Sequence, residues 1–341
     1  MPQTDSAAEG ARILTICNAC RYCEGYCAVF PAMEHRRAFA GADLNFLANL
    51  CHNCAECYYA CQYAPPHAFA VNVPRVLAEI RAQSYRQYAW SNGRYTAGVF
   101  ALGAVLAFVF ARSAGPRFYD VIPHAFMVAV FGTISGFVLA ALAIGAIRSA
   151  KEFGVRWDTK ALARAAADVL TLEYLRSGGA GCTYPTERHS GARRWFHHCT
   201  FYGFLLCFAS TTVAALYHYG LGRLAPYPYT SLPVLLGTFG GVGLLVGPAG
   251  LYWLKRRRDP ATADANQNSM DLTFLSLLFA TSLTGLLLLV LRASSGMAPM
   301  LLIHLALVAA LFATLPYGKF VHGIYRSLAL LRYALEQRGG R

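Results

Sequence analysis

Eight of the eleven cysteines in this 341-residue chain fall into two copies of one spacing, C-x2-C-x2-C-x3-C. The first copy comprises Cys17, Cys20, Cys23 and Cys27, and the second comprises Cys51, Cys54, Cys57 and Cys61. Each run supplies the four thiolates that a 4Fe–4S cluster needs, and in two-cluster ferredoxins the last cysteine of each run ligates the other cluster. The spacing therefore predicts one cluster on Cys17, Cys20, Cys23 and Cys61, and a second on Cys51, Cys54, Cys57 and Cys27. Such clusters transfer single electrons.

Two other interpretations of these cysteines fit less well. Disulfide frameworks are typical of short secreted chains, and the residues before Cys17 do not have the pattern of a secretory signal. Zinc sites usually join two cysteine pairs across a longer loop, whereas each run here packs four cysteines into eleven residues. The runs depart from the bacterial ferredoxin pattern in one respect, because Ala28 and Gln62, rather than proline, follow the last cysteine.

The remainder of the chain has the composition of a membrane protein, since 56% of all residues are hydrophobic and only 14% are charged. Six long stretches contain no Lys, Arg, Asp or Glu: Tyr95–Ala111, Val121–Ile147, Trp195–Gly222, Leu224–Leu254, Leu272–Leu291 and Ala293–Gly318. Five of them reach the roughly 20 residues needed to cross a bilayer, and the first is short. Continuous rather than alternating apolar composition favours helices over a barrel. We therefore expect six transmembrane helices.

The basic residues indicate the orientation of these helices. Residues 148–194, 255–271 and 319–341 hold eighteen Lys and Arg. Four lie on the opposite side: Arg112, Arg117, Arg223 and Arg292. By the positive-inside rule, both termini are cytoplasmic. This distribution also accounts for the net charge of +13, and it predicts contact with membrane lipid and no nucleic-acid partner.

The predicted fold is all-α, with an N-terminal helical iron–sulfur module followed by a six-helix transmembrane bundle. The expected parts are a cytoplasmic ferredoxin-like module with two 4Fe–4S clusters (1–94), transmembrane helices one and two (95–147), a cytoplasmic insertion with a surface helix (148–194), a four-helix haem-binding bundle (195–322) and a cytoplasmic tail (323–341). Helices are expected over 43–50 and 76–83 in the module and over 160–175 in the insertion. On the last of these, Leu162 lies on the apolar stripe and Asp168 lies off it.

Histidines at the ends of the third and sixth spans are candidate haem ligands. His197 and His198 begin the third span, and His218 ends it. His304 lies near the start of the sixth span, and His322 lies just past its end. Because these spans run in opposite directions, we expect His197 or His198 to face His322 at the cytoplasmic side, and His218 to face His304 at the outer side. Imidazole is a common axial ligand of haem iron, so one or two b-type haems are predicted.

Helix geometry supports this pairing. The eighteen residues from His304 to His322 make five turns, which places both on one face about 27 Å apart. The step from His197 to His218 leaves them roughly 60° apart around the axis, whereas His198 would lie nearly opposite. This favours His197 over His198. The alternative is that these are interfacial, hydrogen-bonded histidines, because polar groups are tolerated at span ends.

Other residues are given structural roles. His124, at the outer end of the second span, is expected to be a polar cap without a partner. Cys182, Cys199 and Cys207 lack the cluster spacing and are assigned no chemistry. No Walker or G-x-G-x-x-G motif opens a helix, so no flavin or nucleotide site is predicted in this chain.

The chain resembles the tricarballylate and citrate utilization B proteins over nearly its whole length. The resemblance includes the two cysteine runs and the segments 193–204, 217–219 and 316–326. The ending Pro-Tyr-Gly-Lys-Phe-Val-His, with a histidine eighteen residues earlier, is also locally similar to the gamma-type cytochrome b subunits of respiratory nitrate reductases.

This family resemblance implies that the protein reoxidises the reduced FAD of a partner tricarballylate dehydrogenase and passes electrons through the clusters and haem b to the quinone pool. The flavin and the tricarboxylate site then belong to the partner. The chain would be an oxidoreductase component in a bacterial inner membrane, with or without quinone reductase activity of its own. Two alternatives stay open, namely a quinol-oxidising subunit that feeds a soluble reductase, and a membrane-anchored iron–sulfur sensor without haem.

Overall fold

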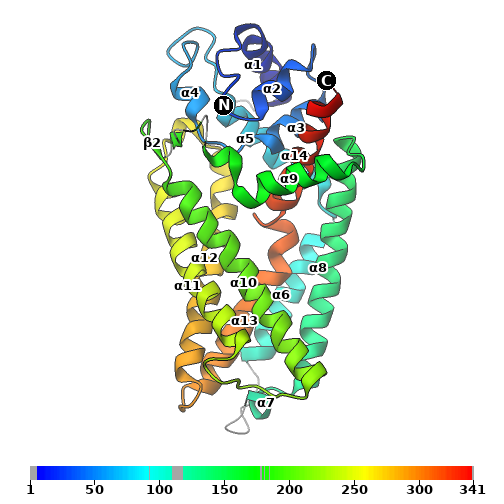
Figure 1. Cartoon of the computed structure of the whole chain (residues 1–341), viewed down its shortest axis with the longest axis vertical. Coiled ribbons are helices and arrows are strands. Elements are labelled where there is room, and N and C mark those ends of the chain that lie inside the picture. The colour runs from blue at the N-terminus through cyan, green and yellow to red at the C-terminus, as the bar shows by residue number, and fades with distance from the viewer. Residues whose placement is uncertain are drawn as a thin grey trace.

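The structure, a computed structural model, describes residues 6–91, 93–109, 118–176, 179, 181–183 and 185–339. A helical module lies at one end of a long helical bundle, and both ends of the chain lie at the module end (Figure 1). Within the described residues the chain is nearly all-helical, as predicted. The one exception is a short antiparallel hairpin of β1 (Cys182–Thr183) and β2 (His189–Ser190).

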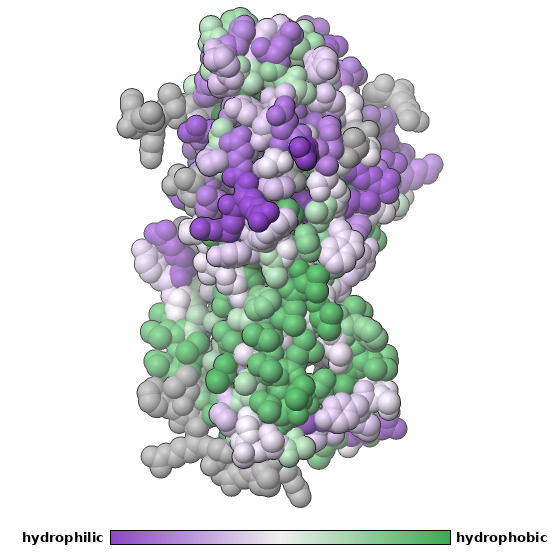
Figure 2. All heavy atoms as spheres, turned by 90° about the vertical axis from the view of Figure 1, so that its left-hand side faces the viewer, coloured by the Kyte–Doolittle hydropathy of each residue, from purple (hydrophilic) through white to green (hydrophobic). Residues whose placement is uncertain are grey.

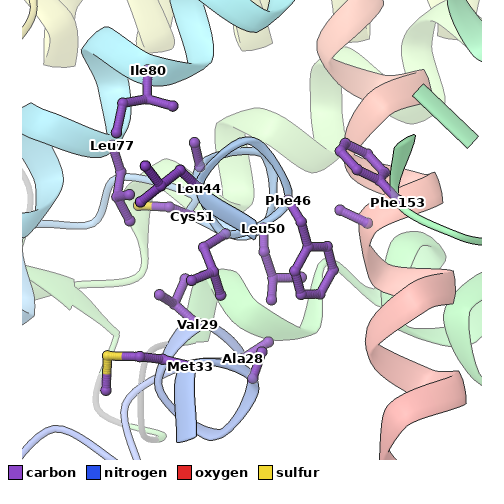
Figure 3. Packing of buried hydrophobic residues seen from close by; sticks show 14 of the residues in the cluster. Ala28, Val29, Met33, Leu44, Phe46, Leu50, Cys51, Leu77, Ile80 and Phe153 are labelled. Atoms are coloured by element: carbon purple, nitrogen blue, oxygen red, sulfur yellow. The ribbon is translucent and has the colours of Figure 1, made fainter. Parts of the chain in front are cut away.

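Five helices form the N-terminal module: α1 (Ser6–Cys20), α2 (Val29–Glu34), α3 (Gly41–Leu50), α4 (Glu56–Tyr59) and α5 (Val73–Tyr88). The helices predicted over 43–50 and 76–83 are confirmed as parts of α3 and α5. Apolar side chains of α2, α3 and α5 meet in one buried cluster (Figure 3). Both cysteine runs adjoin this core. Cys51 is part of it, and the cysteines that pack against it are Cys17, Cys23, Cys27, Cys57 and Cys61.

The C-terminal helix α14 (Val321–Gly339) belongs to the same core. Its Tyr325 is buried and makes ring contacts with both Tyr85 and Tyr88 of α5. Near its end, Glu336 pairs with Arg36 of the module at 2.8 Å. Residues 323–339, predicted as part of a cytoplasmic tail, are thus a packed helix that joins the module to the bundle.

The bundle contains α6 (Gly93–Val109), α8 (His124–Glu152), α10 (Ala192–Leu221), α11 (Leu232–Arg256), α12 (Ala265–Leu291) and α13 (Met297–Thr314). Figure 2 shows apolar side chains gathered over this part of the molecule, while polar side chains cover the module. Short elements occupy connections: α7 (Phe118–Val121), η1 (Glu173–Arg176), η2 (Pro260–Thr262) and η3 (Leu315–Tyr317).

Five helices of the described chain, not the predicted six, are long and apolar enough to cross a membrane. They are His124–Glu152, Ala192–Leu221, Leu232–Arg256, Gln267–Leu291 and the stretch Met297–Gly339, which includes η3 and α14. The predicted first span corresponds to α6, which has 17 residues. At 1.5 Å per residue it extends about 26 Å, less than the ~30 Å hydrocarbon core. Residues 110 and 111 of that predicted span lie outside the described residues.

The helices α10 and α11 pack so closely that glycine is required between them. A Cβ atom on Gly240 would lie 2.8 Å from the Cys207 backbone nitrogen, and one on Gly247 would lie 2.6 Å from the Thr200 nitrogen. Small residues allow this approach in membrane helices. The fourth predicted span begins later than expected, at Leu232 instead of Leu224, because the connection before it is rich in proline.

The insertion carries the predicted surface helix, α9 (Thr159–Thr171), which lies across the junction of module and bundle (Figure 1). The Asp158 side chain caps it by accepting a hydrogen bond from the Ala161 nitrogen at 2.7 Å. The predicted apolar face is confirmed only in part. Ala165 and Leu175 are buried, but Leu162 is 42% exposed whereas Asp168 is 6% exposed. Asp168 tolerates burial through its ion pair with Arg164.

We predict that Gly247→Val destabilises the protein by about 1–3 kcal/mol, because the added side chain meets backbone atoms of α10 that cannot move independently. Gly98→Ala is the matched control, since a Cβ atom there has nothing within 4 Å. Thermal unfolding of both variants in the same detergent checks this. Equal melting temperatures would contradict the close packing of α10 against α11.

Candidate iron–sulfur and histidine sites

The first cavity of the module gathers the cysteines predicted for the first cluster. It has a volume of about 240 Å³, and the cysteines lining it are Cys17, Cys20, Cys23, Cys57 and Cys61. Cys61 comes from the second run, so the fold brings the last cysteine of one run to the first three of the other. The donor set and the space both fit an iron–sulfur cluster. The ligand assignment itself stays a prediction.

The second cavity gathers the cysteines predicted for the second cluster: Cys27, Cys51, Cys54 and Cys57. Its volume is about 10 Å³, which is room for about one water molecule. The four cysteines match the ligand set of a cluster, but this volume is too small for one. The segments that line the cavity would have to move apart to hold a cluster. Cys57 lines both cavities, so the two sites are adjacent.

Left-handed backbone turns aim the cysteines into these cavities. Arg21, directly after Cys20, has φ 56°, and Asn53 and Ala55, on either side of Cys54, have φ 56° and 69°. This conformation is costly for residues other than glycine, above all for an alanine, and such residues cluster at functional sites. Here the turns reverse the chain within a few residues, so that successive thiols face the same space.

Burial and crowding raise the pKa of four of these thiols, which keeps the four protonated when no metal is bound. Burial, followed by the neighbouring thiols, raises the pKa of Cys17 and of Cys23 to about 12. Burial also raises the pKa of Cys27 and Cys57 well above the usual value. Because a metal binds the thiolate, metal binding here must displace these protons.

Arginine side chains fasten the second cysteine run to the bundle. Carbonyl oxygens of residues 48–53 accept their hydrogen bonds: His52 (2.8 Å) and Asn53 (2.9 Å) from Arg193, Leu50 (2.9 Å) from Arg326, and Ala48 (3.0 Å) and Cys51 (2.7 Å) from Arg81. Arg81 belongs to the module, whereas Arg193 begins α10 and Arg326 lies in α14. The second site is therefore the one next to the membrane helices.

One helical turn beyond these arginines lies the inner histidine pair. His197 follows Arg193 by four residues, and His322 precedes Arg326 by four, so each histidine shares a helix face with its arginine. The His197 and His322 rings are 6.0 Å apart between centroids and inclined by 70°. His197 and His322 are therefore the two residues that could hold a metal-containing group at this end of the bundle.

The hydrogen bonds of the inner pair leave nitrogen atoms available as ligands. The His322 Nδ1 lies 2.5 Å from the Lys319 carbonyl oxygen, so it must carry the proton and Nε2 keeps its lone pair. The Nδ1 of His197 is buried without a hydrogen-bond partner. His198 instead lies 3.2 Å from the Thr171 carbonyl oxygen at the end of α9. The structure thus brings His197, and not His198, to His322.

At the outer end the histidines are arranged differently from the prediction. The His218 ring stacks on His124, with centroids 4.3 Å apart and an interplanar angle of 15°. His304 is hydrogen-bonded through Nδ1 to the Thr284 hydroxyl of α12 at 3.1 Å. Ring contacts between His218 and His304 do not occur in the described part of the chain. The expectation that His124 has no partner was therefore wrong.

The family described as citrate utilization protein B matches residues 97–341, and the Fer4-like domain of citrate utilization protein B matches residues 10–87. The chain is 47% identical to citrate utilization protein B of Escherichia coli over 359 aligned positions, which cover 99% of this chain and 94% of that protein. No solved structure matches it.

A Fer4-like domain joined to helices that can span a membrane indicates a membrane protein with an iron–sulfur electron-transfer role. The chain belongs to the citrate utilization protein B family, as the sequence resemblance implied.

Sequence reasoning missed several contributors to these sites. The arginines of the junction had a usable signal, because Arg193 and Arg326 each lie four residues from a candidate histidine. The position of Cys182, beside Cys54 and His52, had none, since more than 100 residues separate it from both.

We predict that Arg193→Gln lowers the reduction potential of the second cluster by an amount on the order of tens of millivolts, because a positive charge near a cluster favours its reduced, more negative form. Redox titration followed by electron paramagnetic resonance (EPR) measures this shift. Arg194→Gln is the matched control, because the neighbouring guanidinium binds the Thr171 carbonyl instead. An identical potential in both variants would contradict the role of Arg193.

Proposed function

We propose that this protein is the membrane electron-transfer partner of an FAD-dependent tricarballylate dehydrogenase, or of a dehydrogenase for a related tricarboxylate. It reoxidises the reduced FAD of that partner and delivers the electrons to the quinone pool. Iron–sulfur clusters and haem b supply one-electron carriers when they are bound. The observation that carries the proposal is that the second cysteine turn is bound by Arg193 and Arg326, which lie one helical turn from the inner histidine pair.

The order of the sites supports a path that runs between the module surface and the membrane helices. The first cavity has Tyr22 on its lining, which is 67% exposed, and it lies away from the arginine contacts. The second cavity is lined by the Cys51–Cys54 turn that Arg193 and Arg326 hold. A flavoprotein docked on the module therefore meets the first site before the second, and the second site lies next to the histidines.

The residues that would hold haem are His197 and His322. Both come from helices long enough to span a membrane, both are partly buried, and their free nitrogens are compatible with axial ligation. A second haem on His218 and His304 remains part of the prediction, and His124 offers His218 a different partner. The proposed location is the bacterial inner membrane with both termini in the cytoplasm, where the excess of basic residues lies.

We predict that His322→Ala loses the inner haem whereas His198→Ala keeps it, because only the first removes a member of the facing pair. Haem per chain, measured as the pyridine haemochrome, checks this. Retention of both cluster EPR signals shows that the module stays folded. Full haem content in His322→Ala would contradict the assignment, and absence of haem from the native protein would favour the iron–sulfur sensor.

We predict that Cys20→Ser stops electron delivery from the reduced dehydrogenase to quinone while leaving the haem in place, because it removes one predicted ligand of the first cluster. Anaerobic proteoliposomes containing the protein and quinone, mixed with the reduced partner, provide the assay, and quinone reduction is followed optically. A chemical reductant should still reduce the haem of the variant. Unchanged quinone reduction would contradict entry through the first site.

A further inference from the structure

A thiol from the insertion lies beside Cys54 of the second cysteine site, although its sequence position gives no sign of this. Cys182 is fully buried at 0% exposure. Its Sγ, the Sγ of Cys54 and a ring nitrogen of His52 all lie within 4.8 Å of one another. All three residues are buried, and the Nε2 of His52 has no hydrogen-bond partner. The group is therefore a set of metal-ligating atoms beyond the eight cysteines of the two runs.

Contacts from the insertion hold this thiol in place. The Thr183 hydroxyl donates a hydrogen bond to the Cys54 carbonyl at 3.3 Å, and the Cys182 thiol donates one to the Leu175 carbonyl at the same distance. Cys182 also pairs with Ser190 across the β1–β2 hairpin. The hairpin is thus docked on the cysteine turn itself, and the position of the sulfur follows from backbone contacts on two sides.

A separate structural zinc site explains this group poorly. Structural zinc takes four ligands, and the group offers three, one of which is the predicted cluster ligand Cys54. Iron–sulfur clusters are held by thiolates, and a thiol beside a ligand thiol can reach the same metal. The arrangement therefore fits a fifth sulfur at the second cluster better than it fits a second metal.

We propose that Cys182 is a reserve ligand of the second iron–sulfur cluster, able to replace Cys54, and that it tunes the cluster while Cys54 is bound. This inference rests on the cluster-binding part of the proposed function. When Cys182 replaces Cys54, the bond between iron and the Cys54 sulfur would break, a bond between iron and the Cys182 sulfur would form, and the Cys182 proton would pass to the departing Cys54 thiolate, with no change in oxidation state. In the intact protein, the buried thiol is a polar neighbour of the Cys54 sulfur, and such neighbours set cluster potentials.

The decisive test compares Cys54→Ala with Cys51→Ala, because Cys51 does not belong to the three-residue group. Full-length protein is purified anaerobically, and iron and labile sulfide are measured per chain, with the EPR of each cluster. Cys54→Ala is expected to keep both clusters with an altered second signal. Cys51→Ala is expected to lose roughly half of the cluster iron. Equal losses in the two variants would overturn the proposal.

Two double variants assign the effect to Cys182. Cys54→Ala/Cys182→Ala is expected to lose the second cluster, whereas Cys54→Ala/Cys199→Ala removes a thiol of α10 and is expected to behave like Cys54→Ala. The single variant Cys182→Ala should keep both clusters and shift the potential of the second alone, a readout that does not depend on the double variants folding. The proposal would be overturned if Cys182→Ala left the potential of the second cluster unshifted and Cys54→Ala/Cys182→Ala kept that cluster intact. Absence of clusters from the native protein would refute the proposed function instead.

Discussion

The structure depends on guanidinium groups that hold the second cysteine turn against the ends of the membrane helices. Arg193 and Arg326 donate to backbone carbonyls of residues 50–53, and Arg81 donates from the module side. An unpaired charge in such a position would be costly, and each guanidinium has several donors in a fixed geometry. Lysine, a compact charge with a flexible stem, could not join two carbonyls in the same way. These contacts determine where the cysteine sites lie relative to the histidines.

The same contacts make the module and the bundle one unit, although the family matches divide the chain between residues 87 and 97. The helix α14 packs in the module core through Tyr325 and its neighbours, and it also carries His322 one turn earlier. The end of α8 joins that core as well, where Phe153 meets Phe46 and Tyr88. A boundary drawn along the sequence therefore does not separate the two parts in space.

The spacing of residues along the sequence predicted much of this arrangement, because such spacing reflects the geometry within a single segment of the chain. The cysteine runs and the long apolar stretches each follow from helix or cluster geometry within one segment. The step from His304 to His322 was predicted as five turns of one helix, but α13 ends at Thr314 and α14 begins at Val321, so the two histidines lie on different helices. Predictions that required contacts between distant segments were less successful. The burial of Asp168 depends on α14 packing against α9, and the stacking of His218 on His124 depends on how α8 approaches α10. A single sequence carries no periodic signal for either contact.

The two ends of the bundle also differ in charge, which bears on where a haem fits best. At the inner end, Lys255 and Lys319 both pair with Asp271, so this group keeps an excess positive charge. The nearby Arg326 binds the Leu50 carbonyl. A b-type haem carries two propionates, and such a cationic surrounding stabilises carboxylates. At the outer end the neighbours of His218 are Tyr119, Tyr219 and His124. The inner pair therefore lies beside the cationic groups of Lys319 and Arg326, whereas the outer rings are paired through His218 and His124.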